Sequence, residues 1–368
     1  MPEQLPQATR DLCDAAVTLA DTVLATSAAL DRDQARGQIV AAAKAAGLYT
    51  LTQPAAFGGS EADQLTLCAV RDALASRNPV NAQWVFGPGP GVLVNVDGAL
   101  RQQYLQPLLA GLKTAGFGLT EPDDAPHYTR AIRDGDELVI DGQKSYVTGG
   151  DHADFINTLV RLDDEPVLVI VDTNLPGVRK TRVFRSIDGS HHAAFRFEAV
   201  RIPASHMIGK PGDGMPRALG QIGDTRLAIA ATCVGQLRWV YDYLTNYLSS
   251  TDRRGKPRGD AAVARLRLGQ IFTAGYAARS VLYRTARLID SGANGVNEAM
   301  ASKVLATQAL STAVDEAIQL VGGGAVVEDH PLAILYQKVR SLRLAEGATD
   351  VLYQNIARGR LELSKGEL

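Results

Sequence analysis

The sequence predicts an α+β protein that is mostly α, in three parts: an N-terminal helical domain over residues 1–114, a middle antiparallel β domain over 115–212 and a C-terminal four-helix bundle over 213–368. Apolar residues recur at helical spacing in the first and last parts. The middle part instead has short runs of β-branched residues between Gly, Asp and Pro turns. A cluster of helix-breaking residues at 209–214 marks the second boundary.

The first part is expected to contain four helices. Two Ala-rich stretches carry apolar residues at helical spacing, and two later stretches suit the same structure. The break at residues 57–60 contains two glycines, and Ser60 is a suitable N-cap for the helix that follows. The predicted helices are residues 11–29, 36–46, 61–75 and 99–112.

The middle and last parts differ in the length of their apolar segments. Polar and apolar residues nearly alternate over 193–202, which is typical of a half-buried antiparallel strand. The other predicted strands are residues 137–140, 155–162 and 166–172. Segments long enough for a helical bundle follow the second boundary, at residues 224–249, 260–291, 297–321 and 331–360.

The composition is that of an ordinary globular protein, with 46% hydrophobic and 21% charged residues. The net charge of −2 argues against a mainly electrostatic grip on nucleic acid or an anionic membrane. No apolar run approaches the roughly 20 residues of a membrane span, and the N-terminus lacks the pattern of a secretory signal. Three separated cysteines without metal-ligand spacing indicate free thiols, so we expect a cytoplasmic protein with no metal site.

Four motifs carry the functional information. The first two are Gly-Leu-Thr-Glu-Pro at 118–122 and Asp-Gly-Gln-Lys-Ser-Tyr-Val-Thr at 141–148. The other two are Gln-Leu-Val-Gly-Gly-Gly at 319–324 and Glu-Gly-Ala-Thr at 346–349. In order and spacing these motifs resemble the acyl-CoA dehydrogenases, flavoenzymes that oxidise the Cα–Cβ bond of an acyl thioester. The resemblance extends from about residue 10 to residue 362.

The resemblance implies that Glu346 removes the proton α to the thioester carbonyl, while a hydride passes to flavin N5. A carboxylate suits this role when burial raises its pKa, and Gly347 would let the backbone pass close to a ligand. Some relatives carry the base on an earlier helix, where this chain has Thr225, which cannot act as a carboxylate base. Taken alone, the motif also fits a helix-terminal Glu before a Gly turn.

The resemblance also implies an FAD site. Phe117, Leu119 and Thr120 would line the flavin, with Thr120 as a hydrogen-bond donor to the ring. Tyr146 and Thr148 occupy the second flavin strand, although Tyr146 alone also fits a half-buried strand aromatic.

Two further positions imply an oligomer. Gln319 and Gly323 match residues that reach the adenine-diphosphate half of the flavin of a neighbouring subunit, so a homodimer or homotetramer is expected. A Gly run after a helix is otherwise only a C-cap signal.

The substrate side is implied to include Asp224, Thr225 and Arg226, which match the start of the helix that meets the pantetheine arm and nucleotide in relatives. Arg226 also suits an internal ion pair with an acidic side chain. The pair His191 and His192 has no carboxylate or Cys at ligand spacing nearby, and we expect solvated loop histidines there.

Three departures from the family pattern concern ligand contacts. The loop at residues 123–127 is about four residues short and carries two carboxylates, which would repel phosphates. Thr251 replaces an Arg that reaches the partner's flavin, and Ala348 and Asp350 replace a Thr and a Gln. These changes fit a specialised acyl substrate, a carrier-protein thioester or a subunit of a hetero-oligomer.

The expected function is FAD-dependent α,β-dehydrogenation of an acyl thioester, acyl-CoA or carrier-bound, in fatty acid or lipid metabolism. Electrons would pass to an electron-transfer flavoprotein. Two alternatives stay open: a flavin-dependent monooxygenase of the same fold, and a non-catalytic subunit of a hetero-oligomeric dehydrogenase. Glu346 favours the dehydrogenase, because monooxygenases of this architecture generally lack it.

Overall fold

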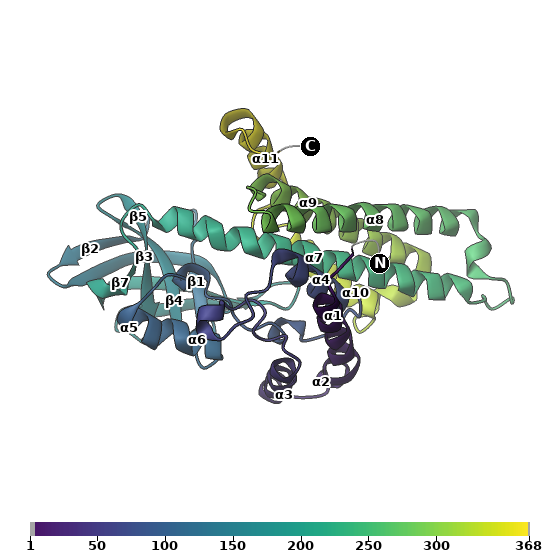
Figure 1. The fold of residues 1–368 in the computed structure, drawn as a ribbon, viewed down its shortest axis with the longest axis horizontal. Helices are drawn as coiled ribbons and strands as arrows, with labels where there is room; N and C mark the ends of the chain where they lie inside the picture. Colours follow the sequence, from purple (N-terminus) through teal and green to yellow (C-terminus); the bar gives the residue numbers. More distant parts are fainter. Residues whose placement is uncertain (1–3, 367–368) are drawn as a thin grey trace. The chain divides into compact units, whose positions relative to one another are not determined.

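A computed structural model describes residues 4–366, apart from the side chain of Asp224 (Figure 1). The chain divides into two compact units. The helical unit comprises Met1–Gly87 and Gly223–Leu368, and the β unit comprises Pro88–Ile222. Helices build the first unit and a sheet dominates the second, which confirms the α+β fold class. The three-part domain boundaries stay a prediction.

The N-terminal helices of the helical unit lie close to their predicted positions, but α4 begins later than residue 61. Its N-cap is Asp63 rather than Ser60, because the Asp63 carboxylate accepts the Thr66 N–H at 2.7 Å. The helices are α1 (Gln7–Leu19), a π-helical turn (Ala20–Leu24), α2 (Ala25–Ser27), α3 (Arg32–Ala45) and α4 (Gln64–Ala75).

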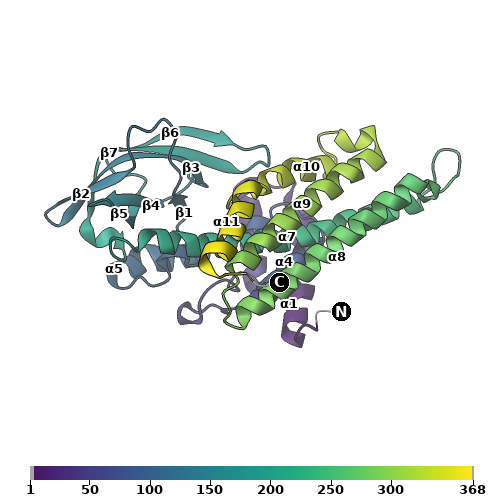
Figure 2. The same ribbon diagram turned by 90° about the horizontal axis from the view of Figure 1, so that it is seen from above.

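Five helices complete this unit: α7 (Gly214–Ser249), which belongs to it from Gly223 onward, α8 (Ala262–Asp290), α9 (Val296–Val321), α10 (Pro331–Leu342) and α11 (Thr349–Leu363). Helices α8 and α9 run side by side in both views (Figure 1, Figure 2), and α10 and α11 pack against α9. The prediction of one helix over 331–360 is wrong. Glu346 and Gly347 have φ angles of 53° and 112°, and backbone of this kind cannot continue a right-handed helix.

The core of the helical unit surrounds a buried carboxylate, Asp72 of α4, whose side chain is 1% exposed. Its Oδ1 accepts a hydrogen bond from Arg238 Nη1 at 2.7 Å. Its Oδ2 accepts from Arg279 Nε at 3.0 Å and from the Tyr283 hydroxyl at 2.8 Å. Since the partners lie on α7 and α8, this network fixes α4 against both helices.

The β unit contains an eight-stranded sheet in the order β6-β7-β3-β2-β4-β5-β8, with β1 beside β4. Most pairings are antiparallel, as predicted, but β4 pairs in parallel with β1 and β2, so the sheet is mixed. The strands are β1 (Ala115–Gly118), β2 (Arg130–Asp134), β3 (Glu137–Thr148), β4 (Phe155–Leu162), β5 (Glu165–Asp172), β6 (Val178–Arg185), β7 (His191–Pro203) and β8 (Met207–Ile208).

The helix predicted over 99–112 is built from α5 (Gly98–Leu100), a π-helical turn (Arg101–Leu105) and α6 (Gln106–Ala110). Tyr104 attaches this segment to the sheet, because its ring packs edge-on against Phe155 and its hydroxyl donates to Asp172 at 2.7 Å. Within residues 4–366, no helix has the length and apolar character needed to cross a membrane.

Candidate functional site

The first candidate site surrounds Glu346, in the turn that joins α10 to α11. Left-handed backbone is unusual for a residue other than Gly and costs on the order of 1–3 kcal/mol. At Gly347 an added Cβ would lie 2.8 Å from Leu352 Cδ2, so a side chain there would have to displace Leu352, and the φ of 112° would strain it as well. The N–H and hydroxyl of Thr349 donate to Arg343 O at 3.1 Å and 3.3 Å and close the turn.

Two cationic side chains hold the backbone of this turn. Arg226 of α7 donates from Nε to the carbonyl oxygen of Glu346 at 2.9 Å, and Lys303 of α9 donates from Nζ to that of Gly347 at 2.9 Å. Lys303 is completely buried. The two bonds therefore fix a backbone conformation that the turn would seldom adopt alone.

The same surroundings set the proton affinity of the carboxyl group. Burial raises the pKa of Glu346 above its ordinary value of 4.5, while Arg226 and Lys303 oppose the rise. Burial lowers the pKa of Lys303 to about 8. Such a carboxylate is a stronger proton acceptor than an exposed one, yet the two cations favour its ionised form.

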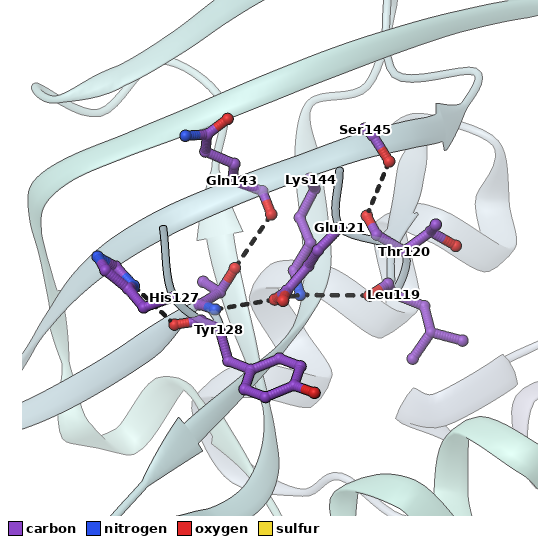
Figure 3. A network of polar contacts seen from close by, with 9 residues as sticks. Leu119, Thr120, Glu121, His127, Tyr128, Gln143, Lys144 and Ser145 are labelled. Carbon is purple, nitrogen blue, oxygen red and sulfur yellow. Dashed lines mark hydrogen bonds and ion pairs between the residues drawn. The ribbon is translucent and has the colours of Figure 1, made fainter. Parts of the chain in front are cut away.

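The second candidate site lies in the β unit, where the loop after β1 runs beside β3 (Figure 3). Thr120 O accepts the Ser145 N–H at 3.0 Å. Lys144 Nζ forms an ion pair with Glu121 Oε1 at 2.7 Å and also donates to Leu119 O at 3.3 Å. The Lys144 side chain is 1% exposed and that of Glu121 is 16% exposed. The loop that carries Leu119 and Thr120 is thus anchored to β3.

An irregularity in the pairing of β3 with β7 lies between Lys144 and Val147. It breaks the alternation of side chains, so Lys144 and Val147 are buried while Tyr146 and Thr148 are exposed. The Tyr146 ring packs edge-on against Phe184, with centroids 4.9 Å apart. Exposed hydroxyl groups and an aromatic ring on one stretch of strand suit a flat ligand with polar edges.

The remaining residues predicted for the flavin ring lie next to this strand. Phe117 is in β1 and Leu119 in the loop after it, and both are half-buried. Thr120 is exposed. The β unit therefore brings together the five predicted ring contacts, and Glu346 belongs to the helical unit.

The prediction that His191 and His192 are solvated loop histidines is wrong for His192. His192 is not a solvated loop residue: it lies in β7 opposite Thr148 and is 8% exposed. His191 is exposed, but its Nδ1 lies 3.1 Å from Asp151 Oδ2, which is also 3.0 Å from His152 Nε2. Folding supplies this carboxylate from a distant part of the sequence. Among residues 4–366, no group of three or more His, Cys, Asp or Glu side chains is arranged to hold a metal ion.

Comparison with known proteins decides the family. Residues 212–361 match the family model described as acyl-CoA dehydrogenase, C-terminal domain. The chain is 28% identical over 341 residues to the glutaryl-CoA dehydrogenase of Desulfococcus multivorans, covering 87% of each chain. The crystal structure of a probable acyl-CoA dehydrogenase from Mycobacterium abscessus matches with a TM-score of 0.87 at 25% identity, covering 97% of this chain and 99% of that one. The chain belongs to the acyl-CoA dehydrogenase family.

This family membership confirms the predicted class of enzyme, a flavoprotein oxidoreductase that acts on CH–CH groups. A structure of PigA with FAD and proline shares the fold, with a TM-score of 0.85 at 21% identity, covering 98% of this chain and 99% of that one. This likeness shows that the two chains share a fold.

The other residues implied by the acyl-CoA dehydrogenase pattern lie in the helical unit. Gln319 lies in the last turn of α9 and Gly323 in the turn after it, and both are exposed. Thr225 is half-buried in α7, and the side chain of Asp224 lies outside the described residues. Arg226 bonds to a backbone carbonyl rather than to the acidic side chain considered from the sequence.

Lys303 is not among the residues that the sequence predicts for the site, although its position on the buried face of α9 is a signal that could have identified it. It lies in an Ala-rich stretch of α9 between the buried residues Met300 and Val304. A lysine on the buried face of a helix needs a partner, and the partner here is a carbonyl group of the Glu346 turn.

Proposed function

We propose that this acyl-CoA dehydrogenase family member catalyses FAD-dependent α,β-dehydrogenation of an acyl thioester with Glu346 as the base. The observation that supports this most is the raised pKa of a carboxyl group on a turn fixed by Arg226 and Lys303. A proton α to a thioester is weakly acidic, so its removal needs an aligned base of increased proton affinity. Glu346 has the increased proton affinity, and the bonds from Arg226 and Lys303 fix the backbone of its turn.

FAD is the proposed cofactor, and the residues fit it. Exposed Tyr146, Thr148 and Thr120 offer an aromatic ring and two hydroxyl groups to its ring. A Cβ added at Gly323 would meet nothing within 4 Å, so the backbone there is open to a phosphate group. When bound, FAD would supply the acceptor for the β-hydrogen of the substrate. The proposed ring contacts are Phe117, Leu119, Thr120, Tyr146 and Thr148, with Gln319 and Gly323 at a partner's flavin.

The proposed substrate is an acyl-CoA or a carrier-bound acyl group, with Asp224 and Thr225 on its side of the site. The bond from Arg226 to the Glu346 carbonyl favours a role in positioning the base over contact with a phosphate. An electron-transfer flavoprotein is the proposed acceptor. Because Gln319 and Gly323 are exposed, we propose a homodimer or homotetramer, with a hetero-oligomer as the alternative assembly.

An absorption spectrum of the purified chain, followed by anaerobic titration with acyl-CoA thioesters, tests the proposal. We expect a flavin spectrum that bleaches when thioester is added without oxygen. Oxygen-dependent consumption of an external reductant, with no bleaching by thioesters, would favour the monooxygenase. A protein that stays colourless with added FAD, and turns yellow only with a partner chain, would favour the non-catalytic subunit.

Replacing Lys303 by Met is expected to move the acid limb of the pH–rate profile for bleaching to higher pH. Lys303 favours the ionised form of Glu346, so its loss raises the pKa of that carboxyl further. Loss of the bond to Gly347 O also loosens the turn, and misplacement by about 1 Å costs roughly 100-fold in rate. Lys256→Met, in the loop between α7 and α8 where the lysine is exposed, is the control. A Lys303→Met profile that coincides with that of wild type would contradict the role of Lys303.

A further inference from the structure

A chain of four polar side chains in the β unit ends at Thr148. The Ser190 hydroxyl donates to Asp188 Oδ1 at 2.6 Å, and the Ser190 N–H donates to the same oxygen at 2.9 Å. His192 Nε2 lies 2.9 Å from Ser190 Oγ, and His192 Nδ1 lies 3.3 Å from Thr148 Oγ1. The chain thus connects a carboxylate with an exposed hydroxyl group on the proposed flavin surface.

Hydrogen-bond chemistry fixes the direction of every proton in this chain. An ionised carboxylate only accepts, so Ser190 gives its one hydroxyl proton to Asp188. Ser190 Oγ must then accept from His192, which places a proton on Nε2. Burial lowers the pKa of His192, which keeps the ring neutral and leaves Nδ1 without a proton. The Thr148 hydroxyl therefore donates to Nδ1.

Packing holds the His192 ring in this orientation. The ring stacks on Phe184, with centroids 5.4 Å apart and planes at 25°, and the centroid of the Tyr146 ring lies 5.5 Å from that of His192. His192 and Thr148 are also paired residues of β7 and β3. The pairing of β3 with β7 therefore fixes which group donates in the bond between Thr148 and His192. With its proton directed inward, Thr148 presents only the lone pairs of its oxygen to a ligand.

We propose that His192 is a positioning residue that fixes Thr148 as a hydrogen-bond acceptor and thereby favours the reduced flavin over the oxidised flavin. The inference rests on the proposed function, in which Thr148 contacts the flavin ring. Two-electron reduction adds N–H groups to an isoalloxazine ring, so an oxygen that can only accept binds the reduced ring better. One hydrogen bond changes the ratio of the two states by about tenfold.

The experiment compares the two-electron midpoint potential of FAD bound to wild-type protein and to His192→Phe, by equilibration with a reference dye. Phe keeps the stacking on Phe184 and removes both ring nitrogens. Thr148 is then free to donate, and we expect the potential to fall by about 30 mV, which corresponds to a tenfold change for two electrons. In a Thr148→Val background the same replacement should leave the potential unchanged.

Two further variants keep the inference testable if His192→Phe does not fold. Ser190→Ala removes the acceptor that holds the proton on Nε2, and it should lower the potential in the same direction. His191→Phe alters the adjacent residue, which contacts Asp151 instead of Thr148, and it should have no effect. Flavin-bound His192→Phe and Ser190→Ala proteins with the wild-type potential would overturn the inference alone. A wild-type protein that binds no FAD would overturn the proposed function as well.

Discussion

Replacing Glu346 by Gln is expected to slow anaerobic bleaching of the flavin by acyl thioester roughly 10²- to 10⁴-fold, the usual contribution of a general base. The amide has nearly the shape of the carboxyl group and cannot take up the α-proton. The turn should survive the change, because Arg226 and Lys303 bond to the backbone carbonyls of residues 346 and 347. FAD should therefore stay bound, and only the rate of bleaching should fall.

A matched control separates this effect from a general loss of charge. Glu362→Gln changes an exposed glutamate of α11 that pairs with Arg358, and this variant should bleach at the wild-type rate.

The bleaching rate of the wild-type protein should also rise with pH through a value above 4.5, because only the carboxylate form of Glu346 accepts the proton and the pKa of Glu346 is raised. Bleaching of Glu346→Gln at the wild-type rate would remove this residue from the mechanism.

At the two candidate sites, the sequence predicts the residues of the short motifs better than the side chains that contact those motifs from other parts of the fold. The sequence alone suggests Glu346 as the base because it stands beside Gly347 in a short motif, whereas Arg226 and Lys303 bond to this turn from other helices. The spacing of apolar residues over 331–360 does not predict the helix break, because the break depends on the left-handed φ of Glu346. The contacts that stabilise this φ are tertiary, and periodicity does not contain them.

In the β unit, the burial of His192 likewise depends on contacts that the local sequence does not contain. The local sequence is polar and follows a Gly, which is typical of a loop. Its burial comes from pairing with Thr148 of β3, so it depends on a strand more than forty residues away. Tyr146 and Thr148 were identifiable from their motif, but their exposure depends on the irregularity in β3, which the alternation of residues does not predict.

Replacing Lys144 by Met is expected to lower the free energy of unfolding of the β unit by about 3–5 kcal/mol, because it leaves the Glu121 carboxylate largely buried without its cation. Hydrogen exchange of the β3 and β4 amides would measure the change. In the double variant Glu121→Leu/Lys144→Met both charges are absent, so most of the stability should return. Recovery should be incomplete, because the Thr129 N–H loses the acceptor it has at 2.8 Å.

The pH dependence of this loss tests the ion pair itself. Burial alone would raise the pKa of Glu121, but the bonds from Lys144 and Thr129 outweigh it and lower the pKa below 4.5. A lowered carboxyl pKa contributes stability above the ordinary value, and that stability is lost as the pH falls through the lowered pKa. The difference in stability between wild type and Lys144→Met should therefore shrink below pH 4.5. A difference that stays constant through this range would mean that Lys144 acts by packing and not by charge.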